Sequence, residues 1–196
     1  MGVRGRVFVI TGPSGVGKGT LIRGLMERMP EIELSVSATT RPPRAGERDG
    51  VDYHFLSEQE FGERRARGEF VEDVDYAGSS YGTLRSELEG RAASGAPVVL
   101  EIEVQGARLV RRALPAATQI FIAPPSLAEL RRRLKARGTD EAEKVERRLE
   151  VAAQELDARE EFAYVVLNDE VERALDELEE IVRRELRGAA NGASEP

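Results

Sequence analysis

Cysteine is absent from the 196-residue sequence, which excludes disulfide bonds and any chemistry that needs a thiol. This absence fits a reducing compartment, and we expect a cytoplasmic protein. No apolar run comes near the length of a membrane-spanning helix, so we expect no membrane partner. The N-terminus lacks the pattern of a signal peptide. Met1 and Gly2 resemble the start of a myristoylation site, but Arg6 stands where that site needs Ser or Thr.

Positive charge is also in deficit. The chain has 29 Lys and Arg against 36 Asp and Glu, a formal net charge of −7, so we expect no nucleic-acid partner. The deficit does not exclude a local basic pocket for small anions, because several arginines are clustered. With 40% hydrophobic and 33% charged residues, the composition is that of a globular protein. The length fits one domain with insertions around a substantial core.

The most informative stretch covers residues 12–20 and reads G-P-S-G-V-G-K-G-T. Before it, residues 6–11 are mostly apolar and β-branched, which predicts a buried parallel strand. After it, the apolar residues at 21, 22, 25 and 26 predict one face of a helix. The glycines therefore lie on a turn between a strand and a helix, the context of a phosphate-binding loop.

The chemistry of such a loop follows from its backbone. Glycines let the chain curl so that several N–H groups point to one centre, and the next helix adds its own unpaired N–H groups and positive dipole end. Lys18 adds a mobile charge that can follow a phosphate. An ordinary glycine-rich turn is the alternative, but the spacing, the lysine and both flanks favour the phosphate loop. The strict pattern has Ser or Thr after the lysine as a Mg²⁺ ligand, whereas here Gly19 precedes Thr20. This variant resembles the nucleoside monophosphate kinases rather than the GTPases.

A proline-rich loop follows the next predicted strand, residues 33–37. Residues 37–47 contain two prolines, which forbid a helix and favour an extended loop. Arg41 and Arg44 on this stiff loop would grip the oxygens of a second phosphate in pairs. On composition alone, a solvated basic loop is an equally good interpretation.

At this loop the sequence resembles a known family. The pattern Ser-X-Thr-Thr-Arg-X-Pro-Arg-X-Gly-Glu at residues 37–47, followed by G-V-D-Y-H-F, is similar to the GMP-binding signature of the guanylate kinases. The similarity continues with G-E-F-V-E at 68–72, Y-G-T at 81–83 and L-E-I-E-V-Q-G at 100–106, and it spans about residues 5–186. It implies phosphorylation of GMP to GDP with ATP, and we expect dGMP to serve as well.

The resemblance also implies a pocket for GMP. Its residues would be Ser37, Arg41, Arg44, Tyr53, Glu72, Tyr81, Thr83 and Glu103. The arginine and tyrosine side chains would donate to the phosphate. Glu72 and Glu103 would accept from the N1–H and 2-amino edge of guanine, a pair of donors that adenine lacks. Thr83 stands where Ser is common in the family, and Glu103 where Asp is common. Taken singly, most of these residues could be strand, core or solvated surface residues, but their combination and order favour the pocket.

We expect residues 37–90 to form an insertion that carries this pocket. A capping box at Ser57 and Glu60 would open a helix that stops near Gly68. Beyond the insertion, residues 96–103 predict a buried strand that ends in acidic residues, where phosphate-loop proteins place a carboxylate that helps to hold Mg²⁺. Glu101 is our candidate ligand, directly or through water, and Thr20 is a second one. A capping or salt-bridged Glu101 is the alternative.

A basic segment follows the predicted strand at residues 118–123. Ser126 and Glu129 form a second capping box, which would open a helix that reaches Arg137, and a further helix would start near residue 140. A solvated basic surface is the usual interpretation of such a run. The resemblance instead implies a mobile lid at residues 126–148, whose arginines close over ATP. The candidates are Arg137, Arg148 and Arg133.

The C-terminal part completes the expected core. Residues 163–169 predict the last strand, and the resemblance places Asn168 beside the adenine. An apolar stripe over residues 171–186 predicts a helix that packs on the core. Residues 188–196 are small and polar, and we expect a disordered tail.

The expected fold class is α/β, with a P-loop NTPase-type parallel sheet flanked by helices, a GMP-binding insertion and a helical lid. The core would comprise residues 1–36, 91–125 and 149–187. ATP would lie on Gly12, Pro13, Ser14, Gly15, Val16, Gly17, Lys18, Gly19 and Thr20, with Arg133, Arg137 and Asn168.

We expect direct in-line transfer from Mg²⁺-bound ATP to GMP, with no general base, because the attacking phosphate oxygen is already anionic. The residues that stabilise the transition state would be Lys18, Arg41, Arg44, Arg137 and Arg148. A kinase for another phosphorylated acceptor is one alternative, against which Glu72 with Tyr81 and Thr83 argues. A non-catalytic binding module related to this family is the other, against which the intact loop argues.

Overall fold

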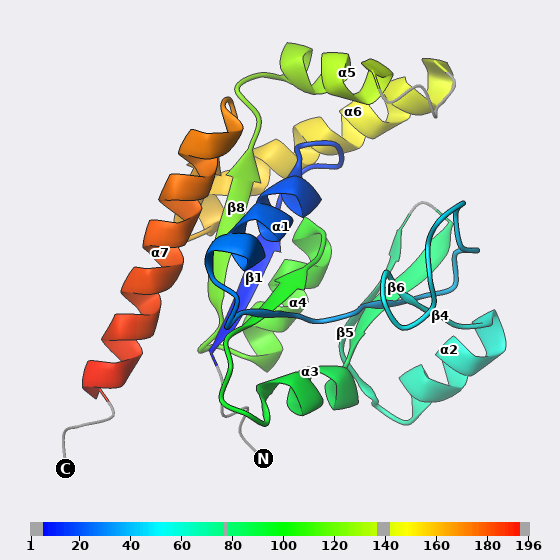
Figure 1. Ribbon diagram of the computed structural model, residues 1–196. Helices are drawn as coiled ribbons and strands as arrows, with labels where there is room; N and C mark the ends of the chain where they lie inside the picture. The colour runs from blue at the N-terminus through cyan, green and yellow to red at the C-terminus, as the bar shows by residue number, and fades with distance from the viewer. Residues whose placement is uncertain (1–5, 77, 137–141, 193–196) are drawn as a thin grey trace.

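The computed structural model describes residues 6–76, 78–136 and 142–192, and a five-stranded parallel sheet forms its centre (Figure 1). Its strands follow the order β2 (Glu33–Leu34), β7 (Val98–Glu101), β1 (Val7–Thr11), β8 (Thr118–Ala123) and β9 (Tyr164–Leu167). Every neighbouring pair is parallel. Because the carboxyl ends of parallel strands meet at one edge, β1 and β7 deliver the phosphate loop and Glu101 to the same side of the molecule.

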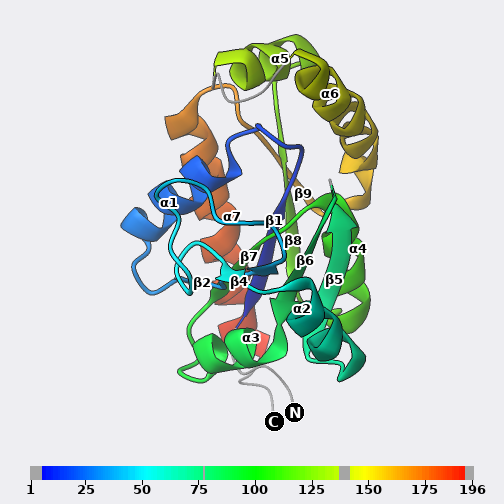
Figure 2. The ribbon, with the colours of Figure 1, turned by 90° about the vertical axis from the view of Figure 1, so that its right-hand side faces the viewer.

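Helices cover both faces of this sheet, as Figure 2 shows. Alternate residues of each strand point to opposite faces. Phe8 and Ile10 join a buried cluster with helices α1 (Lys18–Arg28) and α7 (Val171–Gly192). Val7 and Val9 join a second cluster with α4 (Val104–Ala113). The central strands are therefore apolar on both faces, as the sequence predicts.

The insertion builds a second, smaller sheet. Its strand order is β4 (His54–Phe55), β3 (Ala38–Thr39), β6 (Ser79–Leu84) and β5 (Phe70–Tyr76). Helix α2 (Glu58–Ala66) packs on it, and the rings of Phe61 and Phe70 stack with centroids 4.5 Å apart. The capping box at Ser57 and Glu60 is confirmed in both directions. Helix α3 (Arg85–Ala92) then returns the chain to the main sheet.

An arm of two helices, α5 (Leu127–Ala136) and α6 (Ala142–Asp157), rises above the sheet in Figure 1. The predicted end of the lid at residue 148 lies inside α6, which continues without a break and buries Leu149 and Ala152 in the core. A short 3-10 helix, η1 (Ala158–Glu161), connects α6 to β9.

Three sequence expectations need correction. The strand predicted over residues 33–37 comprises only Glu33–Leu34. The strand predicted to end at Glu103 ends at Glu101, because Glu103 is already the N-cap of α4. The tail predicted to be disordered from residue 188 remains helical through Gly192, since Ala189 and Ala190 are strong helix formers. Within the described residues, no helix has the combination of length and apolar character that crossing a membrane requires.

Candidate active site

The phosphate loop between β1 and α1 has a backbone that only glycine fits at two positions. Gly12 has a φ of 141°, and a Cβ there would lie 2.3 Å from the Ile122 carbonyl oxygen. Gly17 has a φ of 101° as the N-cap of α1, and a Cβ there would lie 2.6 Å from Nδ2 of Asn168. The loop therefore passes close to β8 and to the end of β9, with the N-terminus of α1 behind it.

Lys18 lies folded over this loop. Its Nζ donates to the carbonyl oxygens of Gly12 at 2.6 Å and Pro13 at 3.5 Å. Next to it, a Cβ on Gly19 would lie 3.7 Å from Oε2 of Glu101, so this carboxylate faces the position where the strict pattern has a hydroxyl. Thr20 is exposed one residue further on. The structure thus places Glu101 beside Gly19, the residue that follows Lys18.

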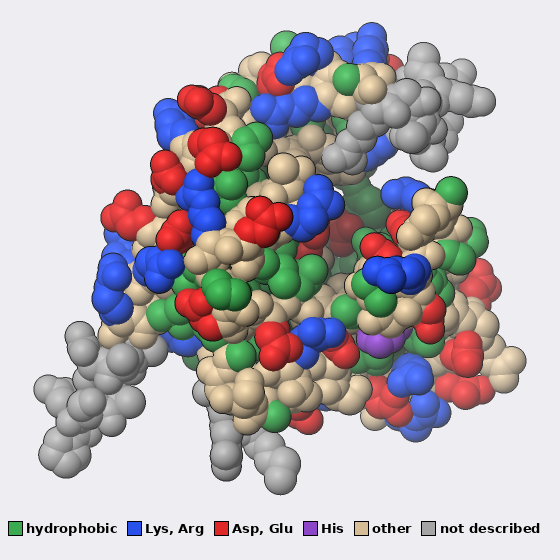
Figure 3. Space-filling model, in the orientation of Figure 1, with side chains coloured by type: hydrophobic (Ala, Val, Ile, Leu, Met, Phe, Trp, Pro, Cys, Tyr) green, Lys and Arg blue, Asp and Glu red, His purple; other side chains and the backbone are tan. Residues whose placement is uncertain are grey.

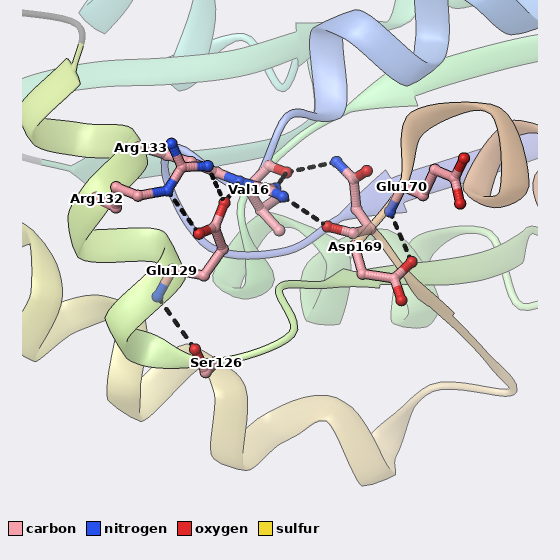
Figure 4. Close-up of polar contacts among 8 residues, drawn as sticks. Val16, Ser126, Glu129, Arg132, Arg133, Asp169 and Glu170 are labelled. Carbon is pink, nitrogen blue, oxygen red and sulfur yellow. Dashed lines mark hydrogen bonds and ion pairs between the residues drawn. The ribbon is translucent and has the colours of Figure 1, made fainter.

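The outer side of the loop is held by Arg133 and Asn168. Figure 4 shows Arg133 beside Val16. The Val16 carbonyl oxygen accepts from Nδ2 of Asn168 at 2.7 Å and from Nη1 of Arg133 at 3.1 Å. Nη2 of Arg133 also donates to the Asn168 carbonyl oxygen at 2.9 Å. Asn168 is 3% exposed, and its Oδ1 has no hydrogen-bond partner among the residues that the structure describes.

Of the other two predicted lid arginines, the structure describes one. Nη2 of Arg148, on α6, donates to Oγ of Ser14 in the loop at 2.7 Å. Arg137 lies outside the described residues.

In the insertion, Glu72 of β5 is buried opposite the start of α4. It is 5% exposed, and Oγ1 of Thr83, its neighbour in the β5–β6 register, donates to its Oε1 at 2.8 Å. A Cβ on Gly106 would come within 3.0 Å of its Oε2. Burial raises the pKa of Glu72 to about 7 against the effect of the Thr83 hydrogen bond, and the charge of Glu103 raises it further.

The predicted phosphate ligands of the insertion form a second group. Both Arg41 nitrogens Nη1 and Nη2 donate to Glu47, at 3.0 and 2.9 Å, and the guanidinium lies 5.2 Å from the centre of the Tyr53 ring. Tyr81 meets Tyr53 edge-on, with ring centroids 6.2 Å apart. Burial is the main cause that raises the pKa of Tyr53 to about 12, so it remains a hydroxyl donor. The Arg44 side chain is exposed on the same loop.

The remaining predicted residue of the pocket, Ser37, is half-buried, and its backbone carbonyl accepts a hydrogen bond from the backbone N–H of His54 at 2.9 Å.

In the space-filling view the molecule is hollowed between the arm and the insertion, and acidic side chains lie inside the hollow (Figure 3).

Comparison with known proteins decides the family. The family model described as "Guanylate kinase" matches residues 4–185. The chain belongs to the guanylate kinase family. It is 54% identical over 174 residues to the guanylate kinase of Synechococcus sp. (strain CC9311), and this alignment covers 89% of this chain and 92% of that protein. It is 50% identical over 185 residues to the guanylate kinase of Rubrobacter xylanophilus, and that alignment covers 94% of this chain and 97% of the relative.

A solved guanylate kinase, from Anaplasma phagocytophilum, is similar in structure with a TM-score of 0.76 and 34% identity, over 92% of this chain and 86% of that one. The predicted fold class and family are thereby confirmed. A guanylate kinase converts GMP to GDP with ATP, so the predicted activity is confirmed with them. The two alternatives, a kinase for a different acceptor and a non-catalytic module, lose their support.

Sequence reasoning missed one residue, Glu155, that lines a cavity together with Tyr76 and Glu103. Burial raises the pKa of Glu155, on α6, to about 7, although the charge of Lys18 and the backbone N–H of Ser14 act in the opposite direction. Its Oε2 is buried without a hydrogen-bond partner among the described residues, beside a cavity of about 110 Å³. A signal was available, because Glu155 follows Arg148 by two helical turns and so shares its face.

Proposed function

We propose that GMP binds under the insertion, that ATP binds on the phosphate loop, and that phosphoryl transfer takes place directly between them. One observation carries this proposal. A cavity of about 110 Å³ is lined by Tyr76 of the insertion, by Glu103 at the start of α4 and by Glu155 of α6. Arg148, on the same helix as Glu155, donates to Ser14 in the phosphate loop. The acceptor pocket and the loop therefore face the same cleft.

Guanine recognition is assigned to the buried carboxylate of Glu72, with Glu103 beside it. An ionised carboxylate accepts two hydrogen bonds, which matches the N1–H and 2-amino group of guanine. Adenine would leave a buried acceptor unpaired, a mismatch that costs several kcal/mol, on the order of 2–5. Thr83 fixes the rotamer of Glu72 from the neighbouring strand.

The phosphate of GMP is assigned to Arg41, Arg44, Tyr53 and Tyr81, with Ser37 at the edge of the pocket. Glu47 supports this assignment, because it binds the Arg41 guanidinium and also accepts the backbone N–H of Arg44 at 2.7 Å. A single carboxylate thus keeps the loop ordered before the substrate arrives.

ATP is assigned to residues 12–20, with its adenine near Asn168. The unpaired, buried Oδ1 of Asn168 supports this, since the 6-amino group of adenine is a donor of the required kind. Arg148 and Lys18 lie on the loop where the phosphates would bind. The roles of Arg133 and Arg137 toward ATP stay predictions.

Mg²⁺ fits this site as an ion bound mainly by substrate and water. No group of three His, Cys, Asp or Glu side chains is placed to hold a metal in residues 6–76, 78–136 and 142–192. Glu101 beside Gly19 and the Thr20 hydroxyl are the protein groups that would hold it, and Mg²⁺ ordinarily needs few protein ligands. When bound, it neutralises charge on the β- and γ-phosphates.

The reaction needs positioning and charge stabilisation rather than a base. The attacking oxygen of GMP is already anionic, so the protein must align it with the γ-phosphorus and exclude water. Lys18, Arg41, Arg44 and Arg148 supply the positive charge, and Arg137 remains a candidate.

A coupled assay of ADP release across GMP, dGMP, AMP, UMP and ribose phosphates tests the proposal. We expect GMP and dGMP to be phosphorylated and the others to be turned over at least about a thousandfold less efficiently. Equal turnover of AMP would contradict the role of Glu72. The cytoplasmic location stays a prediction from the sequence.

A further inference from the structure

The base of the arm is fastened to the phosphate loop by a small polar network (Figure 4). Arg133 of α5 uses three separate donors in it. Nε donates to Glu129 at 2.8 Å, Nη1 to the Val16 carbonyl at 3.1 Å and Nη2 to the Asn168 carbonyl at 2.9 Å. The guanidinium is planar, so three bonds on different edges fix both its position and its orientation.

The carboxylate of Glu129 has different hydrogen-bond partners from the one that its sequence pattern predicts. As the third residue of a capping box, its carboxylate should return to the backbone N–H of Ser126. One half of the box is present, since the Glu129 backbone N–H donates to Oγ of Ser126 at 3.1 Å. The carboxylate instead accepts from Arg133 and, through both oxygens, from Arg132 at 2.7 and 2.8 Å. Hydrogen bonds from Arg132 and Arg133 lower its pKa to about 2, so the ionised form is favoured at neutral pH.

The carbonyl held by this network belongs to the peptide unit that joins Val16 to Gly17. In a trans peptide the C=O and the next N–H point in opposite directions. Arg133 and Asn168 hold the Val16 carbonyl oxygen on the outer side of the loop. The N–H of Gly17 therefore points to the inner side of the strand-to-helix turn. Gly17 has no side chain to resist rotation of this peptide, so the orientation depends on the carbonyl partners.

We propose that Glu129 is a positioning residue for ATP: by holding Arg133 against the Val16 carbonyl, it aims the Gly17 amide at the bound phosphates. This inference rests on the proposed function, in which residues 12–20 bind the phosphates of ATP. Glu129 reaches the loop only through Arg133.

The chain offers a matched control. Arg132 binds the same carboxylate as Arg133, but its side chain is 71% exposed, and within the described part of the chain its hydrogen bonds and ion pairs are with Glu129 alone. Arg132→Ala removes one ion pair from Glu129 and leaves the bridge to the loop in place. Glu129→Gln weakens both pairs, and Glu129→Ala removes them and serves as a second variant.

The experiment measures the Gly17 amide and the kinetics in parallel. The ¹⁵N–¹H signal of Gly17 should move in Glu129→Gln and Glu129→Ala and stay in place in Arg132→Ala. With saturating GMP, the Glu129 variants should lose about tenfold in kcat/KM for ATP. The Kd of GMP, measured by calorimetry, should be unchanged. A general loss of structure would instead weaken the binding of GMP as well.

Two outcomes separate the inference from the function on which it rests. If ADP moves the Gly17 signal of the wild-type protein, but Glu129→Gln matches Arg132→Ala in both signal and kinetics, the inference is overturned and the loop keeps its assignment. If ADP leaves the wild-type Gly17 signal unmoved, the assignment of residues 12–20 to ATP is wrong, and the inference fails with it.

Discussion

The buried carboxylate of Glu72 allows stability and activity to be separated by one substitution, Glu72→Gln. The residue is 5% exposed, and burial raises the pKa of its carboxyl group from an ordinary 4.5 to about 7. Between these two values the folded protein holds a proton that the unfolded chain has lost. Unfolding then releases that proton, so this group lowers the stability of the protein progressively as the pH rises from 4.5 to about 7.

The size of the effect follows from the same shift. Each pH unit between the folded and unfolded pKa is worth about 1.4 kcal/mol, so the ionised carboxylate costs about 3 kcal/mol above pH 7. Glutamine carries no charge and keeps an acceptor for Thr83, but it adds an amide that needs a partner. Glu72→Gln should therefore raise the free energy of unfolding by about 1–3 kcal/mol at pH 8, and by little at pH 4.5.

The same substitution should disable GMP binding. Guanine presents two donors, N1–H and the 2-amino group, and glutamine replaces one of the two acceptors by a donor. We expect the Kd of GMP to rise about a hundredfold, while the Kd of ATP stays within about twofold.

Urea unfolding at pH 4.5 and pH 8, with calorimetric titration of each nucleotide, measures both effects. Glu89→Gln, an exposed position on α3 with the same change of charge, is the control and should show neither. A stability gain that is the same at both pH values would show that Glu72 is not desolvated. Unchanged GMP affinity would remove it from the guanine site.

Three further substitutions test the loop, the pocket and a helix cap. Lys18→Ala should lower kcat at least about a thousandfold in the coupled assay with an unchanged circular dichroism spectrum; wild-type-like turnover would refute the mechanism. Gly106→Ala places a Cβ 3.0 Å from Oε2 of Glu72, so the Kd of GMP, measured by calorimetry, should rise about tenfold. An unchanged Kd would mean that the Glu72 side chain shifts to accommodate the added methyl group without loss of GMP binding. Ser57→Ala removes the N-cap of α2 and should lower the free energy of unfolding by about 1 kcal/mol without affecting kcat; no loss would contradict the capping contact with Glu60.

Features that depend on neighbours in the chain could be predicted from the sequence. The turn from β1 into α1 is fixed by glycines and by the apolar runs on either side. The capping box at Ser57 needs contacts over three residues only, and β8 has the predicted bounds, 118–123. The order of the family's motifs along the chain was enough to predict the family and its fold, and the guanine pocket around Glu72 stays a prediction.

Local patterns failed where two kinds of partner compete for the same atoms. Glu129 has the sequence of a capping box, yet its carboxylate binds Arg132 and Arg133, because the guanidinium groups three and four residues further along the same helix are stronger partners than a backbone N–H. Likewise, nothing in the sequence says that Arg133 reaches back 117 residues to the carbonyl of Val16.

The sequence by itself thus determined the turn of the phosphate loop and the bounds of β8, and it proposed the acceptor-binding side chains, since these rest on local backbone preference and residue chemistry. Only the tertiary structure decided which of these groups meet: Gly106 against Glu72, Glu101 beside Gly19, Arg148 against Ser14. Such contacts join segments far apart in the chain. They are set by how the sheet, the insertion and the arm pack, and that packing also determines the desolvation that shifts the pKa of Glu72 and Glu155.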